Sequence, residues 1–473
     1  MATQFTPHPD RLLPADPTTR EVARRLYDEV ASLPIISPHG HVNPLLLLDN
    51  EPFGDPAELL ITPDHYVTRM LFSGAGIDGD AVGRTKNGTP SDAEPREIWR
   101  RLAENWFRYH GTPVRYWMEH ELAELFDVTE TLGADNADAI YDQVSARLAD
   151  DAFRPRALFD RFKIEVMATT DDPADDLAAH KALADDGSFS GRVLPTWRAD
   201  RFTDPSGARW LPALDDLENA VDGADCRTYE GLLAAMRASR QHFIEHGATA
   251  TDSGLPDAGS TPLEPAEAER IHAAGLNGTV TEAEAIAYRH NMLYRFAEMS
   301  VEDGLVMQLH PGVIRNHHRA SFEAYGADVG CDFPDVASFT KPLEPLLNAF
   351  GTHPNLHLVL FTVDETVFSR EVGPLAGFYP AVYAGVPWWF IDTPQAILRF
   401  RDAVTDSAGY YKGSGFIDDT RAFLSIPARH DMARRCDAHH LAQRVATHQI
   451  TEDDATQVIK DLTTTIPTAT FKL

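Results

Sequence analysis

Eight short apolar runs, most of them ending in polar residues, recur along this 473-residue chain. They cover Leu33–His39, Ile164–Thr170, Arg192–Trp197, Ile244–Ala250, Leu305–His310, Leu356–Thr362, Val382–Phe390 and Gly415–Thr420. Most are separated by segments with helical character, such as Pro173–Ala184 and Thr281–Met299. This alternation predicts an α/β fold, and eight strands favour a (β/α)₈ TIM-type barrel over an open doubly wound sheet.

The longest interval between runs lies between His39 and Ile164, and most of it has helical patterning (IWRRLAENWFRYHGTP, VRYWMEHELAELF). Barrels of this type often carry large insertions. We therefore expect residues 1–55 and 153–473 to form the barrel. Residues 56–152 are expected to form a helical insertion after strand 1 that covers the barrel mouth. A second irregular stretch, Thr251–Pro265, is rich in Gly, Pro and Asp and predicts a loop.

The net charge of −30 argues against nucleic acid or an anionic membrane as a partner, because both bind basic surfaces. It would also repel an anionic substrate at long range, so a site for such a substrate must supply its own cations. The longest apolar run, Ala381–Ile391, is broken by Pro387 and is shorter than a membrane span of about 20 residues.

The N-terminal stretch MATQFTPHPDRLLPADP lacks the basic and apolar regions of a signal peptide. The three cysteines, Cys226, Cys331 and Cys436, lie far apart in the chain and form no CxxC motif. They indicate neither a disulfide framework nor a cysteine zinc site. We therefore expect a reduced, cytoplasmic protein.

Polar residues gather at the ends of the runs, where a barrel would place its active face. They are His39 and His41, Thr169–Asp172, Arg198, His310, Asp364 and Glu365, Asp392, and Asp419 and Arg421. This coincidence is the strongest argument from the residues themselves that the chain is an enzyme.

His39-Gly40-His41 follows the first run. Residues i and i+2 of a strand face the same side, so both imidazoles can converge on one metal ion. An HxH triplet also arises by chance in a chain with 20 histidines. Its place at the end of the first strand, between Pro38 and Pro44, favours the metal site.

Asp419 ends the eighth run, and strands 8 and 1 are neighbours in a closed barrel. Its carboxylate can therefore join His39 and His41 and leave an open position for substrate, as a catalytic metal site requires. The alternative is that Asp418 or Asp419 only caps the following helix. We predict one divalent metal ion, with zinc as the expected ion.

Lysine placement favours a single metal. Binuclear HxH barrels usually bridge two metals with a carboxylated lysine at a strand end, whereas Lys163 precedes its strand and Lys181, Lys341 and Lys412 fall in helices or loops. Two other motifs are rejected. The G-x-G-x-x-G at residues 74–79 follows a helical pattern, and His120-Glu121 lacks the second histidine of a zincin helix.

Arginines at the predicted active face suit an anionic substrate, because guanidinium binds carboxylate in a bidentate manner. Arg198 follows the third run, Arg315 the fifth, and Arg421 lies two residues beyond Asp419. The alternative for any of them is an ordinary exposed arginine. We single out Arg198 and Arg421 by position, whereas Arg370 and Arg429 would not be selected on sequence alone.

With these residues assembled, the chain resembles the uronate isomerase family of the amidohydrolase superfamily. The resemblance runs from about residue 10 to the C-terminus. It is carried by PIISPHGHVNP, TPDHYVTRML, AFRPRALFDRFKIEVMATTDDP, VLPTWRAD, GLVMQLHPGVIRNHH, LFTVDETVFSR, WWFIDTP and GFIDDTRAFLSIPARHD.

The resemblance implies roles for matching positions of this sequence. The metal ligands fall on His39, His41 and Asp419, the His-Tyr pair of the insertion on His65 and Tyr66, and the arginines on Arg198 and Arg421. We add His310, at the end of the fifth run, as a substrate contact. One position departs from the pattern: relatives often carry Asp-His-Gly where this chain has Asp252-Ser253-Gly254.

The implied reaction interconverts D-glucuronate and D-fructuronate, with D-galacturonate and D-tagaturonate as a further pair, by moving a proton between C2 and C1 through an enediol. We expect Arg198 to pair with the substrate carboxylate and Arg421 to orient its oxygens. Tyr66 would shuttle a proton between O1 and O2, His65 would bind a hydroxyl, and Asp419 would act as base. For Tyr66 the alternative is simple packing within the insertion.

Two other functions stay open at this point. One is a mononuclear metal-dependent amidohydrolase or decarboxylase acting on another carboxylated small molecule; such enzymes also use histidines of strands 5 and 6, and His310 alone is an incomplete match. The other is a sugar-acid binding protein without catalysis. The expected partner is a small sugar acid, and a homo-oligomer is left open.

Overall fold

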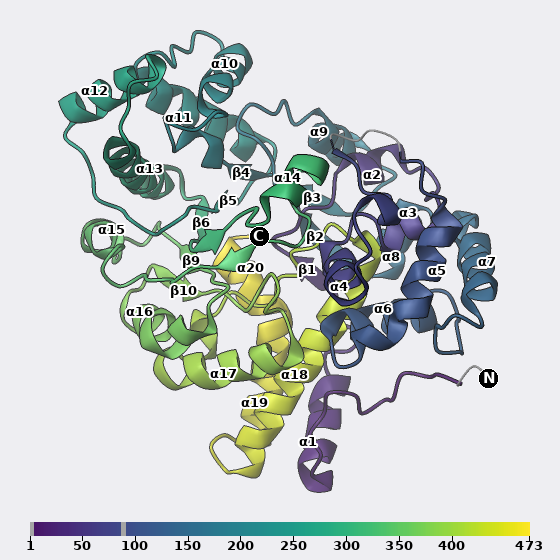
Figure 1. Cartoon of the computed structure of the whole chain (residues 1–473). Coiled ribbons are helices and arrows are strands. Elements are labelled where there is room, and N and C mark those ends of the chain that lie inside the picture. Colours follow the sequence, from purple (N-terminus) through teal and green to yellow (C-terminus); the bar gives the residue numbers. More distant parts are fainter. Residues whose placement is uncertain (1–3, 87–90) are drawn as a thin grey trace.

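The computed structural model describes residues 4–86 and 91–473 (Figure 1). Residues 1–3, which begin the N-terminal stretch analysed above, and residues 87–90, inside the predicted insertion, lie outside the described residues. The strands are β1 (Ile35–Ser37), β2 (Ile164–Ala168), β3 (Arg192–Leu194), β4 (Thr196–Arg198), β5 (Ala250–Ser253), β6 (Val306–Leu309), β7 (Val313–Ile314), β8 (Phe333–Pro334), β9 (Leu358–Leu360) and β10 (Val382–Ala384).

The main strands form two parallel sheets, with the orders β1-β2-β3 and β10-β9-β6-β5-β4. Pro195 separates β3 from β4, which together match the third predicted run. A parallel bridge from Asp171 to Trp197 joins the two sheets at this point. The α/β class with parallel strands is therefore confirmed.

The prediction of a strand over the fourth run, Ile244–Ala250, is wrong. Helix α11 continues through Glu245, and β5 begins only at Ala250. The apolar residue Ile244 belongs to the helix, where it is half-buried. For the same reason the predicted loop Thr251–Pro265 begins too early, because residues 251–253 are strand and Pro265 opens α12.

The last two runs fall short of the strands predicted for them. In the seventh, β10 covers residues 382–384, and the chain then turns, with Trp389 and Phe390 both at positive φ (33° and 62°). In the eighth, residues 415–420 are described but form no assigned strand. Backbone contacts nevertheless tie this segment to both neighbours, through the Ala384–Gly413 bridge and a 3.0 Å hydrogen bond from the His41 amide to the Thr420 carbonyl.

Helices fill the intervals between strands, and their bounds follow from caps and prolines more than from apolar content. For example, α13 begins behind the capping box of Thr281 and Glu284, and α9 begins at Ala178, later than the Pro173 expected from the sequence. Apart from α14 (Arg319–Tyr325), the α-helices from β2 onward are α9 (Ala178–Asp185), α10 (Trp210–Ala220), α11 (Tyr229–Glu245), α12 (Pro265–Leu276), α13 (Glu282–Asp303), α15 (Glu344–Phe350), α16 (Gly373–Phe378), α17 (Pro394–Ala408), α18 (Ile426–Ala446), α19 (Glu452–Lys460) and α20 (Ile466–Phe471).

Between β1 and β2 the described chain contains helices and no assigned strand. Helix α1 (Pro17–Asp28) precedes β1. The α-helices between β1 and β2 are α2 (Leu45–Asp49), α3 (Pro56–Leu60), α4 (His65–Ala75), α5 (Pro95–Asn105), α6 (Pro113–Glu124), α7 (Ala137–Leu148) and α8 (Pro155–Arg161). In Figure 1 the helices α3 to α7, in blue, lie together at one side of the strands. The division at residues 56 and 152 stays a prediction.

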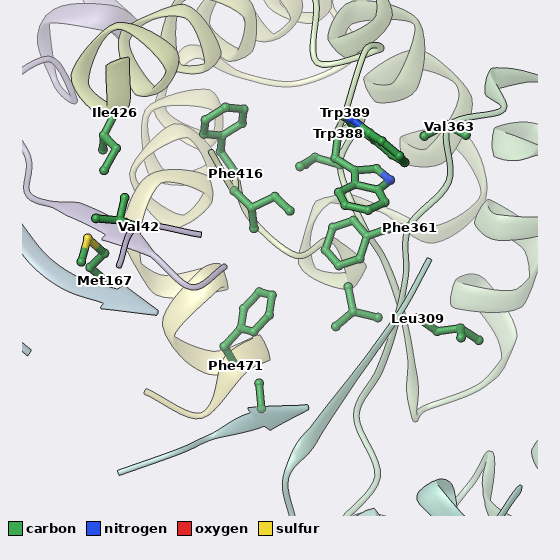
Figure 2. Packing of buried hydrophobic residues seen from close by; sticks show 14 of the residues in the cluster. Val42, Met167, Leu309, Phe361, Val363, Trp388, Trp389, Phe416, Ile426 and Phe471 are labelled. Atoms are coloured by element: carbon green, nitrogen blue, oxygen red, sulfur yellow. The ribbon is translucent and has the colours of Figure 1, made fainter. Parts of the chain in front are cut away.

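The main core packs around the strands, and Figure 2 shows part of it, with Val42 beside Met167 and, in another part of the view, Phe361 beside Trp388. The C-terminal helix α20 ends inside this packing. Phe471 is fully buried, and Leu473 packs against Ile36, Val166 and Leu194 of three different strands. The C-terminal end of the chain is therefore packed against strands that include β1, near the N-terminal end.

One segment after the fifth run was not predicted from the sequence. Residues 313–334 form a small antiparallel pair, β7 with β8, and the short helix α14 (Arg319–Tyr325) between them. No residue of α14 is buried.

Among the helices of the described chain, none has the length and apolar character needed to cross a bilayer.

Candidate active site

His39, His41 and Asp419 meet at the carboxyl ends of the first strand and the eighth run. The Nε2 atoms of His39 and His41 lie 3.3 and 3.1 Å from the same oxygen, Oδ1 of Asp419. One ligand atom from each residue lies within 4.8 Å of the others. The sequence prediction that brought these three residues together is thus matched by the geometry.

The local backbone explains why these side chains converge. The His41 amide donates to the Thr420 carbonyl, and the Asp419 amide donates over 3.4 Å to the His39 carbonyl, which aligns the two segments side by side. Asp419 has a φ of 46°, a left-handed conformation that is uncommon outside glycine. Such strain is found where the surrounding structure holds a residue for function.

A metal ion fits this donor set. Both ring nitrogens of His39 and the Oδ1 atom of Asp419 are buried. Among the described residues, none of these three atoms has a partner with hydrogen-bond geometry. Buried polar atoms are rarely left without partners, so the three atoms fit the ligand sphere of a cation. Two imidazoles and a carboxylate suit zinc and neighbouring transition metals.

The helix-cap alternative for the aspartates is wrong. Asp418 turns away from Asp419 and accepts a hydrogen bond from His430 Nε2 at 3.0 Å. The following helical turns begin behind Ala422 and Ser425, and neither of those caps uses an aspartate. The two adjacent carboxylates therefore serve different partners.

Electrostatics favour an ionised Asp419 and a neutral His41. Burial opposes ionisation of Asp419, but the nearby imidazoles of His39 and His41 outweigh it and lower the pKa of this carboxyl below its usual range. Burial lowers the pKa of His41. A carboxylate and a neutral imidazole are the forms that bind a metal.

A cavity opens beside this centre. Six of the residues selected from the sequence line it, namely His41, His65, Tyr66, Arg198, Asp419 and Arg421. Further lining residues include Asp64, Arg315, Asp328, Trp388, Trp389 and Arg429. Helix α4 thus contributes two residues to this cavity, and the other walls come from residues that follow the strands, from the 313–334 segment and from α18.

Arg198 stands on the wall of the cavity, between two carboxylates. Its Nε lies 2.9 Å from Asp200 and its Nη1 3.1 Å from Asp252, which is fully buried. Asp252 in turn lies 2.6 Å from His310 Nε2. His310 is buried against Trp388 and, in the described structure, is not among the residues that line the cavity. Its substrate contact remains a prediction.

Arg421 and His65 are both tied to Asp328 of the 313–334 segment. Arg421 forms a 2.9 Å ion pair with the Asp328 carboxylate and is about half exposed. His65 Nδ1 lies 3.3 Å from the Asp328 carbonyl, and its Nε2 accepts from Trp389 Nε1. Burial lowers the pKa of His65 to about 3, so this imidazole is neutral near pH 7.

Tyr66 reaches the cavity from the first turn of α4, where Asp64 caps the helix. Its hydroxyl lies 3.1 Å from both oxygens of Asp392 and accepts a 2.9 Å hydrogen bond from the Phe390 amide. Asp392 is paired with Arg429 at 2.7 Å. The packing alternative for Tyr66 does not account for three polar contacts at one hydroxyl.

Sequence reasoning passed over several of these residues. Arg429 was set aside because nothing in a single helical arginine distinguishes it. Trp388, Trp389 and Asp328 lie in irregular segments whose course depends on tertiary packing. The available signal was position, since WWFIDTP begins inside the seventh predicted run and the SIPARHD end of the last block lies a few residues beyond the eighth.

Comparisons with known proteins point to one family. A family model described as glucuronate isomerase matches residues 17–471. A uronate isomerase from Corynebacterium efficiens is 51% identical over 474 residues and covers 100% of both chains.

Solved structures give the same result. The glucuronate isomerase from Caulobacter crescentus superimposes with a TM-score of 0.97 at 44% identity, covering 99% of this chain and 98% of that one. The uronate isomerase from Thermotoga maritima gives 0.91 at 28% identity, covering 99% of this chain and 100% of that one. Since the match spans the whole chain in sequence and in fold, this protein belongs to the uronate isomerase family.

Proposed function

We propose that this chain interconverts D-glucuronate and D-fructuronate, and D-galacturonate and D-tagaturonate, at the cavity beside His39, His41 and Asp419. The observation that carries the proposal is a cavity lined by His41 and Asp419 of the three-residue metal-ligand set, by Arg198 and Arg421, and by the tyrosine–histidine pair. In a chain of net charge −30, such a cationic wall suits a carboxylated substrate.

The proposed architecture is a closed eight-stranded barrel with residues 56–152 inserted over its mouth. Closure is supported by the Asp171–Trp197 and Ala384–Gly413 bridges and by the hydrogen bonds between residues 39–41 and 419–420. The insertion is supported by His65 and Tyr66, which line the cavity from α4. We propose a cytoplasmic location, and no macromolecular partner enters the proposal.

We propose that His39, His41 and Asp419 hold one divalent cation, with zinc expected from the ligand types. When bound, the cation supplies positive charge that stabilises negative charge on substrate oxygens. The chain's own residues do the rest. Arg198 pairs with the substrate carboxylate, Arg421 orients hydroxyl or enediol oxygens, and neutral His65 binds a hydroxyl.

Isomerisation requires removal of the poorly acidic C2 proton and transfer of a second proton from O2 to O1. Asp419 is proposed as the group that handles the C2 proton, because its carboxylate faces the cavity and is ionised. Tyr66 is proposed to move the proton between the oxygens. His310, behind Arg198 and Asp252, is proposed to support the substrate wall.

The proposal is tested by incubating the purified protein with D-glucuronate and following the sugar by NMR, with and without a chelator. We expect D-fructuronate to appear and the chelator to abolish its formation. Release of carbon dioxide would instead favour the decarboxylase alternative, and binding without any product would favour a non-catalytic binding protein.

A further inference from the structure

The hydroxyl of Tyr66 has a defined set of partners that restricts what it can do. A phenol has one proton to donate and two lone pairs to accept with. The Phe390 amide donates to one lone pair of the hydroxyl at 2.9 Å. The hydroxyl itself donates its hydrogen bond to the carboxylate of Asp392, whose two oxygens both lie at 3.1 Å. The remaining lone pair is available to a substrate hydroxyl, so Tyr66 is arranged to accept a proton from the substrate.

A tyrosine that accepts a proton must pass its own proton on. Asp392 is the acceptor already in place, and within the described residues it does not line the cavity, so it reaches the substrate only through Tyr66. It is 3% exposed, and Arg429, 2% exposed, holds its other side at 2.7 Å. Arg429 is fixed in turn over the Trp117 ring at 3.7 Å.

We propose that Asp392, oriented by Arg429, is a positioning residue that holds the shuttled proton behind Tyr66. The inference rests on the proposed isomerase function and deepens it. As the substrate O2–H bond breaks, its proton goes to Tyr66 Oη while the Tyr66 proton goes to Asp392. Asp392 then returns that proton to Tyr66, and Tyr66 delivers its proton to O1.

The two transfers balance, so Tyr66 and Asp392 end in their starting states and no oxidant or reductant is needed. The C2 proton moves separately through another base. Burial raises the pKa of Asp392, against the opposing charge of Arg429, which fits a carboxylate that receives a proton transiently. Burial and Asp392 also raise the pKa of Tyr66 well above its usual range, so a lasting tyrosinate is disfavoured and a relay is needed.

The test is Asp392→Asn, which keeps a hydrogen-bond acceptor for Tyr66 but cannot take its proton. We expect kcat with D-glucuronate to fall on the order of 100-fold while KM changes less than about threefold. Tyr66→Phe should lose a similar factor, and the double variant should lose no more than either single one, because both residues act in one relay. Exchange of the C2 hydrogen with deuterated water should persist in all three.

Three further variants separate the relay from a structural role. Asp437→Asn breaks an equally buried pair, Arg401–Asp437 at 2.6 Å on α17 and α18, and should lower thermal stability but leave kcat unchanged. Arg429→Met with Asp392→Asn removes both charges, so it avoids an unpaired buried arginine. This double variant should have a kcat as low as that of Asp392→Asn. Arg429→Met alone should retain more activity, because the Asp392 carboxylate remains.

The relay is refuted if Asp392→Asn keeps kcat within about threefold of the wild type, or if the losses in the double variant multiply. A fall of kcat that is matched by Asp437→Asn would also contradict it, because any broken buried pair would then suffice. Wild-type protein that does not isomerise glucuronate would instead refute the proposed function itself.

Discussion

At the scale of single residues, Arg198 is the clearest candidate for recognition of the substrate carboxylate. Asp200 and Asp252 fix its guanidinium at the cavity wall. We expect Arg198→Met to lower kcat/KM by roughly 30- to 1,000-fold, because loss of a buried charge-assisted pair costs on the order of 2–4 kcal/mol. The exposed Arg370→Met, whose side chain is 55% exposed, serves as the control. A loss below about threefold would show that Arg198 does not hold the substrate.

Gly254 gives a second prediction at this scale, since the wall has no room for a side chain there. A Cβ at this position would lie 2.6 Å from His310 Cε1 and 2.7 Å from Arg198 Nη2. Gly254→Ala must therefore displace one of these side chains, and we expect kcat/KM to fall at least about tenfold. Gly133→Ala, where nothing lies within 4 Å, is the matched control. Equal activity in the two variants would mean that the wall yields without consequence.

Single residues differ in how far the sequence could reveal them. His39, His41 and Asp419 were accessible because two simple rules suffice, the i, i+2 repeat of a strand and the adjacency of strands 8 and 1. Arg429 and Asp328 were not, and Asp392 was visible only as a polar residue at the end of a run, because each acquires its role only when separate segments meet at Tyr66 and Arg421. Such meetings depend on tertiary packing and leave no local pattern.

At the scale of elements, the apolar runs predicted that the strands exist better than they predicted where each strand begins and ends. The run Ile244–Ala250 mixed the end of α11 with the start of β5, since a short apolar stretch fits either element. The run Val382–Phe390 extended past β10 because the apolar residues that follow it face the cavity and the core from an irregular turn. The 313–334 segment has few buried residues, so its sequence has no apolar periodicity from which its elements could be predicted.

Helix α6 yields a prediction about pH. Glu121 on this helix is 4% exposed, and burial, reinforced by Asp64 and opposed by Arg429, raises its pKa to about 8. The unfolded chain releases this proton near the ordinary pKa of 4.5, whereas the folded chain keeps it up to about pH 8. The contribution of Glu121 to stability is therefore intact below pH 4.5 and is lost as the pH rises toward 8.

The isosteric variant Glu121→Gln removes this dependence, because glutamine ionises in neither state. We expect the variant to be more stable at pH 8 by on the order of 2 kcal/mol, with a melting temperature about 2–4 °C higher, and to match the wild type near pH 4.5. Thermal unfolding at the two pH values measures both. A variant that melts at or below the wild-type temperature at pH 8 would show that Glu121 is ionised in the folded chain.

At the scale of the whole molecule, the fold agrees with uronate isomerase structures, and the chain uses residues from both of its ends to build one centre. His39 and His41 follow β1, Asp419 comes close to the last long helices, and α20 packs its Phe471 into the same core. The parallel α/β class could be predicted from alternation alone. Its specific family could not, and became visible only through long matching blocks of sequence.

We propose that the protein is an isomerase with a single metal ion at His39, His41 and Asp419. The most direct measurement is to strip the purified protein of metal, add zinc in steps and record glucuronate isomerisation. Activity should be absent at the start and should rise to a plateau that begins at about one equivalent per chain. The His39→Ala/His41→Ala variant should neither bind the ion nor gain activity. Full activity in the stripped protein, or a plateau that begins only at two equivalents, would contradict the account.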